Sequence, residues 1–259
     1  MVNLKKYYEY FGLALIMLFS FYYTEQISSI VLNKNPLMIA IKEKESDYEI
    51  SAVSAIIDGD TIIPGIRGQK VNSRESFYRM QENNVFQDTF LVFDKIKPEI
   101  SLEDHKDKII KKGNPKLKKI SFISETEGNV SNYFKANKIP LSLLVTVETY
   151  KSKSYFEMIN NEVTNFKSLE NSLNLNKENK HICIINTSNK DICLKNKNYL
   201  VEPEYRLTGS NLTETKKGIL NGGIIYLTKE AKLDDVIYLL MLAKYKGLTI
   251  VNLSELITE

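Results

Sequence analysis

The chain has 259 residues, with 35 Lys and Arg against 32 Asp and Glu, so its formal net charge is only +3. A hydrophobic content of 43% and a charged content of 26% are typical of globular proteins and exclude disorder along the whole chain. The weak charge also argues against a dedicated nucleic-acid-binding protein, because such proteins attract phosphates with a strong positive field. Two His and two Cys are too few for a His-rich or Cys-rich metal site.

An uncharged apolar run from Tyr10 to Thr24 lies near the N-terminus, after Lys5 and Lys6. The run is shorter than the about 20 residues that cross a bilayer, but tilt and interfacial tyrosines lengthen the segment that a membrane accepts. No small-residue cleavage site follows it, so we interpret residues 1–30 as a cytoplasmic tip and an uncleaved signal anchor. This predicts a single-pass protein of the cell membrane whose C-terminal domain is extracytoplasmic, since the basic residues precede the run. The alternative is a buried helix of a soluble protein.

An extracytoplasmic location would place Cys183 and Cys193 in an oxidising compartment, where disulfides persist. The spacing of the two cysteines permits a bridge, and two free buried thiols are the alternative. A catalytic cysteine is disfavoured, because neither His105 nor His181 lies in a recognisable partner motif.

Residues 31–98 are expected to form a juxtamembrane stretch and a small α+β accessory unit. Its strand candidates are Glu49–Ile57 and Phe90–Phe93, and a capping box at Asn72 and Glu75 opens a helix.

Residues 99–118 are polar and rich in lysine, which predicts a solvated connector. Attraction to anionic lipid or to an anionic wall polymer is the functional alternative for this connector.

Residues 119–259 alternate apolar strand candidates with helices, a pattern typical of parallel βα units in a barrel or a doubly wound sheet. The clearest helix covers Lys232–Lys246 and ends at Gly247. The strand candidates are Ile120–Ser124, Leu141–Val147, Glu162–Asn165, Ile182–Ile185, Tyr199–Val201, Gly223–Leu227 and Leu248–Val251. The residues expected in the core are Ile120, Phe122, Leu143, Val145, Ile184, Ile225, Leu227 and Ile250.

Acidic residues follow two of these strands. Glu125 and Glu127 come directly after the first strand of the series, and Glu202 and Glu204 follow a later one. In a parallel barrel the carboxyl ends of the strands carry the active site, where paired carboxylates support acid–base chemistry or cation binding. Carboxylates in such loops also cap helix N-termini, which is the alternative. No glycine-rich phosphate motif, nucleophile elbow or H-E-x-x-H motif occurs.

The C-terminal stretch resembles the end of a polysaccharide deacetylase (NodB-homology) domain. Its segments N-G-G-I-I-Y-L at 221–227 and K-G-L-T-I-V-N-L-S-E-L at 246–256 resemble the family's G-S-I-I-L-L-H-D and K-G-Y…F-V-T-L-S-E-L. Residues 119–128, 138–145 and 159–165 follow the family's order of T-F-D-D-G, v-k-A-T-F-F-v and n-G-H-E-I-G-N.

The resemblance implies an α/β fold and a polysaccharide setting. We therefore expect a distorted parallel (β/α) barrel of about seven strands over residues 119–259. An N-terminal transmembrane helix and a small α+β pre-domain precede this barrel, as in membrane-anchored bacterial members.

The departures from the family concern its site. Members hold a divalent metal such as zinc with one Asp and two His, use a second Asp as base, and carry a late His as general acid. The matching positions here are Glu125 beside Ser124 or Thr126, Phe166, Glu170 or Leu169, and Thr228 or Lys229. The resemblance thus implies the fold without the metal ligands, so we expect no metal cofactor and no catalytic residue. If the protein is active, Glu125 and Glu127 are the candidates; the expected binding residues are Glu125, Glu127, Phe166, Glu202, Tyr205 and Tyr226.

Three hypotheses remain open. The first is a membrane-anchored, inactive deacetylase-like protein that binds a cell-envelope glycan or a wall-assembly partner. The second is an active carbohydrate deacetylase, hydrolysing C–N amide bonds at a relocated site. The third is a purely structural envelope adaptor. Metal content separates the first two hypotheses, and sugar binding separates the first from the third.

Overall fold

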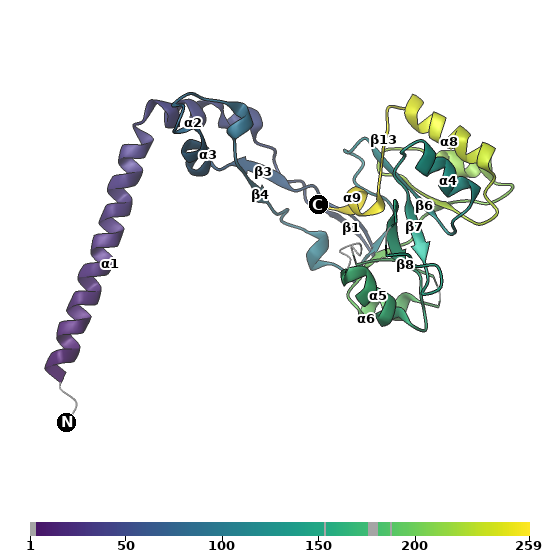
Figure 1. Ribbon diagram of the computed structural model, residues 1–259, viewed down its shortest axis with the longest axis horizontal. Coiled ribbons are helices and arrows are strands. Elements are labelled where there is room, and N and C mark those ends of the chain that lie inside the picture. The colour runs from purple at the N-terminus through teal and green to yellow at the C-terminus, as the bar shows by residue number, and fades with distance from the viewer. Residues whose placement is uncertain (1–3, 153, 176–180, 187) are drawn as a thin grey trace. The chain divides into compact units, whose positions relative to one another are not determined.

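The computed structural model describes residues 4–152, 154–175, 181–186 and 188–259 (Figure 1). The chain forms two compact units. The first contains the residues up to Ser51 together with Gly68–Ile96, and the second contains Ala52–Arg67 and Lys97–Glu259.

The first unit is built from three helices and a two-stranded antiparallel sheet. Apolar residues of α2, α3 and the strands, including Met38, Ile41, Phe77 and Met80, form its core. The helices are α1 (Leu4–Asn33), α2 (Pro36–Tyr48) and α3 (Ser73–Met80); the strands are β3 (Gly68–Val71) and β4 (Phe93–Ile96), with a 3-10 turn η1 (Asp88–Phe90) before β4.

Two features of the sequence bear on the helices of this unit, a cap at the start of α3 and the apolar composition of α1. The Asn72 side chain accepts a hydrogen bond from the Glu75 backbone N–H at 3.0 Å, so the predicted cap does start α3. In α1, the segment Tyr10–Asn33 is long and apolar enough to cross a membrane, by length and composition alone.

The second unit contains two sheets (Figure 1). The first sheet has the order β1-β2-β5-β10-β9 and is parallel except for the β1–β2 hairpin. Its strands are β1 (Ile56–Asp58), β2 (Thr61–Ile63), β5 (Ile109–Ile110), β9 (Ile182–Ile184) and β10 (Tyr199–Val201).

The second sheet is parallel throughout, with the order β11-β12-β6-β7-β8. β13 pairs with the first half of β6 through Lys119–Ser121, and β7 pairs with its end at Ile123 and Ser124. The strands are β6 (Lys119–Ser124), β7 (Ser142–Val145), β8 (Glu157–Asn160), β11 (Tyr205–Leu207), β12 (Ile224–Leu227) and β13 (Thr249–Val251).

Helices and turns connect these strands. They are η2 (Leu102–Asp104), α4 (Asn129–Ala136), α5 (Phe166–Leu175), α6 (Lys190–Lys195), α7 (Leu212–Thr215), η3 (Lys216–Gly218), α8 (Leu233–Tyr245) and α9 (Leu253–Ile257). The predicted helix at Lys232–Lys246 is confirmed as α8, and Gly247 ends it with a φ of +68°.

Alternate strand residues divide the core into an inner and an outer layer. Residues of both sheets share the inner cluster, among them Ile123, Leu144, Ile159, Ile182, Ile184 and Val201. The other face of the second sheet, for example at Phe122 and Ile225, packs on α4 and α8. Strands covered on both faces must be apolar throughout, which explains the continuous apolar runs in the sequence. All residues expected in the core are buried except Ile250, which is partly exposed.

The α/β class with parallel sheets is therefore confirmed. No ladder joins the two sheets within the described ranges, so closure of the barrel stays a prediction.

Several predicted element positions are wrong. The strand expected at Glu162–Asn165 is a loop, and the strand lies at β8, where Met158 and Ile159 fill the core. The apolar pair that defines β8 is flanked by Glu157 and Asn160, which weakened its sequence signal.

The accessory strands and the connector also differ from expectation. The run Glu49–Ile57 forms a strand only from Ile56, with isolated bridges at Ile50 and Val53. Of the strand expected at Phe90–Phe93, only Phe93 belongs to a strand, because β4 begins there. Phe90 is the last residue of the turn η1. Within the polar stretch 99–118, Ile109 and Ile110 form β5 between β2 and β10, so this part is not a solvated connector. β11 was not predicted.

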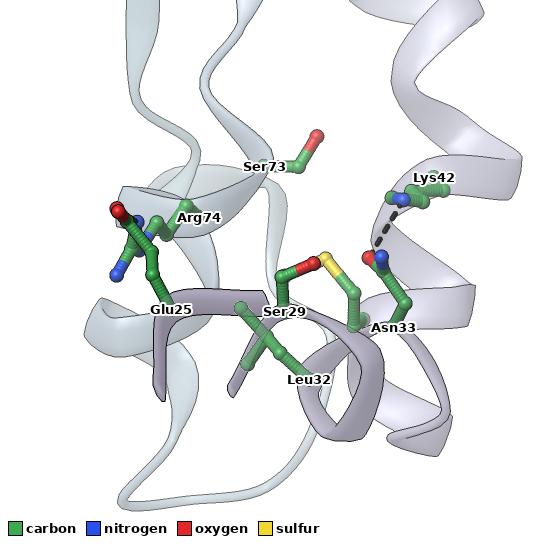
Figure 2. Close-up of a pocket in the computed structure, with 8 residues that line it drawn as sticks. Glu25, Ser29, Leu32, Asn33, Lys42, Ser73 and Arg74 are labelled. Atoms are coloured by element: carbon green, nitrogen blue, oxygen red, sulfur yellow. Dashed lines mark hydrogen bonds and ion pairs between the residues drawn. The ribbon is translucent and has the colours of Figure 1, made fainter. Parts of the chain in front are cut away.

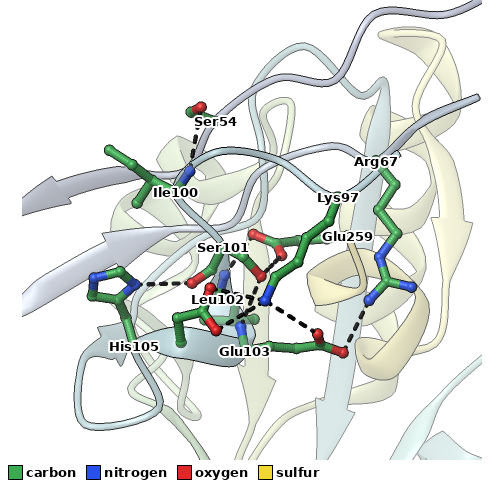
Figure 3. Close-up of polar contacts among 10 residues, drawn as sticks. Ser54, Arg67, Lys97, Ile100, Ser101, Leu102, Glu103, His105 and Glu259 are labelled. Atoms are coloured by element: carbon green, nitrogen blue, oxygen red, sulfur yellow. Dashed lines mark hydrogen bonds and ion pairs between the residues drawn. The ribbon is translucent and has the colours of Figure 1, made fainter. Parts of the chain in front are cut away.

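The Glu259 carboxylate connects three segments of the second unit by hydrogen bonds (Figure 3). One Glu259 oxygen accepts hydrogen bonds from the backbone N–H groups of Gly65, at 2.9 Å, and Leu102, at 2.7 Å. The other accepts from the Ser101 hydroxyl at 2.6 Å. The side chain therefore joins the residues after β2, the start of η2 and the residues after α9.

Candidate functional site

A cleft of about 600 Å³ opens at the carboxyl ends of β6, β7 and β8. The three strands are parallel neighbours, so the loops that follow them meet at one edge of the sheet. Its lining combines carboxylates, hydroxyls, an amide and one amine over an apolar floor: Glu125, Thr126, Glu127, Leu143, Leu144, Thr146, Glu148, Thr149, Lys151 and Asn161.

Glu125 is fixed at this edge from both its backbone and its side chain. Its N–H donates to the carbonyl of Leu227 at the end of β12, and its carboxylate accepts from the Lys229 N–H at 3.1 Å. Glu127 pairs with Lys151 across the cleft at 2.5 Å. The two glutamates predicted from the sequence thus line one cleft, and each has a partner from another loop.

The rim of the cleft is held by Glu162, in the loop after β8. Its carboxylate accepts from the Val147 N–H at 3.3 Å, which connects the loops after β7 and β8. This hydrogen bond, followed by those from Thr164 and the Val163 backbone, lowers the pKa of Glu162 below its ordinary value. The rim loops are therefore joined most firmly when this carboxylate is ionised.

Glu202 and Tyr205 lie at a different place. They line a second cleft of about 520 Å³, with Lys111, Pro203, Glu204 and Arg206, near the carboxyl ends of β5 and β10. Glu202 stands 4.0 Å from the Lys111 amine. The structure therefore does not bring Glu202 and Tyr205 together with the Glu125 cleft.

Tyr226 is buried in the inner core and offers no open stacking face there. The guanidinium of Arg206 lies 4.5 Å from the centre of its ring. Burial, followed by the nearby charge of Glu125, raises the pKa of the Tyr226 phenol.

Phe166 begins α5 and is also buried, in a cluster with Cys183, Ile185, Cys193 and Leu200. It is not among the residues that line the cleft, so it is not placed as the expected binding residue there. The neighbouring Leu169 packs in the core between β7, β8 and α5.

Glu170 is held in a buried polar group away from the cleft. Its carboxylate accepts from Asn160 at 2.9 Å and from Asn198 at 3.3 Å, and His181 lies at 3.3 Å. The carboxylate is therefore already occupied by protein partners.

The structure joins Cys183 and Cys193 in a disulfide, with their Cα atoms 6.1 Å apart. The bridge links β9 to α6 and lies in the cluster around Phe166, which is separate from the inner core.

Sequence reasoning missed the polar residues that complete the Glu125 cleft. Thr146, Thr149 and Lys151 follow β7, and Asn161 follows β8. Correct placement of β8 would have revealed Asn161, because polar residues directly after parallel strands collect at the same edge.

The positions matched to the family's metal site do not meet in one place: Glu125 lines the cleft, whereas Glu170 is not among its lining residues. Phe166 and Leu169 are buried in apolar clusters, and the Thr228 hydroxyl donates to the Leu207 carbonyl at 2.9 Å. Over the described ranges, no group of three or more His, Cys, Asp or Glu side chains is arranged to hold a metal ion.

Comparison of the sequence with known proteins gives one partial match. No family model matches the chain. A segment of 96 residues, 37% of the chain, is 32% identical to the uncharacterized protein YlxY of Bacillus subtilis strain 168. The match spans 30% of that relative's length.

Comparison of the structure gives a broader likeness to BA3943, a CE4 family pseudoenzyme from Bacillus anthracis. The wild-type crystal structure aligns with a TM-score of 0.56 at 16% identity, covering 86% of this chain and 95% of that one. A mutant with restored enzymatic activity aligns with a TM-score of 0.56 at 17% identity, covering 86% and 98%. At this identity the likeness concerns the fold, and the chain has the mixed α/β, deacetylase-like fold of this CE4 pseudoenzyme.

Proposed function

We propose that the protein is a membrane-anchored, extracytoplasmic deacetylase-like protein that binds a cell-envelope glycan without hydrolysing it. The glycan occupies the cleft lined by Glu125 and Glu127, and α1 anchors the chain as a single span. The observation that carries the proposal is the chemistry of this cleft: its lining offers hydrogen-bonding groups suited to sugar hydroxyls, and the described lining residues include no imidazole.

The geometry supports recognition rather than hydrolysis. A hydrolytic metal site needs about three protein ligands and an open position for water. Here Glu125 is fixed by the Lys229 N–H and Glu127 by the Lys151 amine, so neither is a free base beside a metal-bound water. Carboxylates, Thr hydroxyls and the Asn161 amide can instead accept and donate hydrogen bonds to a polyol. The solved relative BA3943 is itself described as a pseudoenzyme, which is consistent with a deacetylase-like fold that carries no reaction.

A catalytic assay and a binding assay with the full chain in mild detergent test this proposal. N-acetylated glucosamine oligomers are incubated with the protein and added Zn²⁺, Co²⁺ or Mn²⁺, and released acetate is measured. We expect no turnover above the metal-only control. Metal-dependent turnover that Glu125→Ala abolishes would replace the proposal with a relocated-site deacetylase.

The same oligomers and peptidoglycan fragments are then used as binding probes. Glu125→Ala removes charged acceptors, and hydrogen bonds to charged groups contribute about 1.5–3 kcal/mol, so binding should weaken about tenfold or more. Glu255→Ala is the matched control, because Glu255 is exposed and pairs with Lys119 at the opposite end of β6. Absence of glycan binding by the wild type would favour the envelope adaptor.

A further inference from the structure

Besides the clefts of the second unit, the structure has a small cavity and an exposed apolar helix face. The cavity lies between α1, α2 and the start of α3, and its cations are engaged within the first unit (Figure 2). Lys42 donates to the Asn33 amide oxygen at 2.9 Å, and Arg74 stands 3.9 Å from Glu25. The exposed apolar face belongs to α8, and its pattern indicates a partner.

Helix α8 is apolar on two opposite sides. Its outer side exposes three large side chains, since Tyr238 is 44% exposed, Met241 67% and Tyr245 89%. Their spacing of three and four residues places them in one stripe along the helix. Aromatic and Met side chains are enriched in protein interfaces, so the stripe is typical of a docking face. The inner side packs in the core through four residues: Val236, Leu239, Leu240 and Ala243.

The charges of α8 complement each other when two copies of the helix run antiparallel. Asp234 lies eleven residues before Tyr245, at the start of the stripe, and is exposed. Asp235 lies eleven residues before Lys246. Eleven residues are about three turns, so each of these pairs shares one side of the helix. A two-fold axis across the middle of α8 therefore places each carboxylate opposite the phenol or the amine of the other copy.

The surroundings of Lys246 have room for the start of a second helix. Its amine donates to the Ile219 carbonyl at 2.7 Å, and an ammonium has three donors, so it can also meet a carboxylate. Beside it Leu220 is 37% exposed and offers an apolar contact. These residues line an open hollow of about 500 Å³ at the end of α8: Pro115, Ile219, Leu220, Asn221, Lys246 and Leu248.

We propose that the outer face of α8 is a dimer interface, on which a second copy of this chain packs its own α8 in antiparallel orientation. Tyr238 of each copy faces Met241 of the other, and a pair between Asp235 and Lys246 closes the interface at each end. Both copies use the same surface, so the assembly stops at two. The lining of the glycan cleft contains no residue of α8, and dimer formation does not depend on glycan binding.

Sedimentation velocity of the full chain in mild detergent, over a range of protein concentrations, measures the dimer. Met241→Glu should weaken it about tenfold or more, because a charge in the middle of an apolar interface loses its hydration. Val85→Glu is the matched control and should dimerise as the wild type does, since Val85 is 59% exposed and belongs to the first unit. Circular dichroism checks the folding of every variant, and Tyr245→Ser replaces Met241→Glu if that variant unfolds.

Two charge reversals test the antiparallel pairing. Asp235→Lys and Lys246→Asp each place like charges opposite each other in a pair of identical copies, so each variant alone should dimerise about tenfold more weakly. A mixture of the two variants restores opposite charges at both ends of the interface and should recover the dimer.

Three results would overturn the interface. One is a wild type that stays monomeric at every concentration. Another is a dimer that neither Met241→Glu nor Tyr245→Ser weakens, which would assign the association to another surface such as α1. The third is failure of the two folded charge variants to pair when mixed, because the antiparallel arrangement requires their recovery.

Discussion

The Glu259 carboxylate shows how a single residue can join segments far apart in the sequence. It accepts two backbone N–H groups and one hydroxyl, from Gly65, Leu102 and Ser101. These hydrogen bonds hold the three segments together, and loss of the carboxylate leaves the donors without their partner.

We therefore predict that Glu259→Ala lowers the free energy of unfolding by about 2–3 kcal/mol. Glu259→Gln should cost less, because the amide keeps one acceptor oxygen without the charge. Urea unfolding of the full chain in mild detergent measures the effect. Glu255→Ala removes another glutamate, in an exposed pair with Lys119, and should change the stability by less than about 1 kcal/mol. Equal effects of the two alanine variants would show that the Glu259 contacts contribute little.

At the scale of elements, the turn before β12 packs backbone segments closely together, and this packing helps to position the site. Gly223 packs against the carbonyl oxygens of Gly218 and Leu220, and its own carbonyl accepts the Ser121 N–H of β6 at 3.0 Å. β12 ends beside Glu125, so this turn sets the register of the strand that holds that residue.

Gly223→Ala should destabilise the protein by about 2 kcal/mol or more, because the added Cβ would collide with backbone atoms that cannot rotate away. Gly128→Ala is the matched control, since a Cβ there meets no atom within 4 Å and the backbone is extended. Thermal unfolding followed by circular dichroism reports both variants. A stable Gly223→Ala protein would mean that the β12 turn relaxes more easily than this packing indicates.

At the scale of the whole molecule, the proposed anchoring of α1 would decide which compartment the two units occupy. Lys5 and Lys6 precede the apolar run, and basic residues of an anchor remain on the cytoplasmic side. The proposed extracytoplasmic placement agrees with a disulfide between Cys183 and Cys193, because such bonds persist in oxidising compartments.

We predict that a phosphatase reporter fused after Glu259 is active, and that a reporter requiring the cytoplasm is inactive at the same position. Substitution of Lys5 and Lys6 by Glu should reduce this bias, since the topology depends on the positive charge at that flank. A cytoplasmic reporter signal from the unmodified chain would reject the anchor and, with it, the proposed location of the glycan cleft.

Periodicity and capping residues in the sequence determined much of the fold. The apolar runs of β6, β7, β9, β10 and β12, the stripe of α8 and the Asn72 cap all follow from local rules. Such elements can be predicted from the sequence, because burial on both faces of a strand or along one stripe of a helix imposes a recognisable pattern of apolar residues. The placement of Glu125 and Glu127 after the first parallel strand was visible for the same reason.

Only the tertiary structure decided which polar residues share a site. Glu202 follows β10 as Glu125 follows β6, but β10 lies in the other sheet, and Tyr205 begins the edge strand β11, so their cleft is separate. Phe166 matched a ligand position in order along the chain, yet α5 turns its side chain into the core. The two-residue strand β5 and the shifted β8 are fixed by pairing with distant strands rather than by their own pattern. The sequence by itself determines the elements with a strong apolar pattern, because that pattern is local. Contacts across the sheets determine the weakly patterned strands and the site, because strand order is set by packing between distant segments.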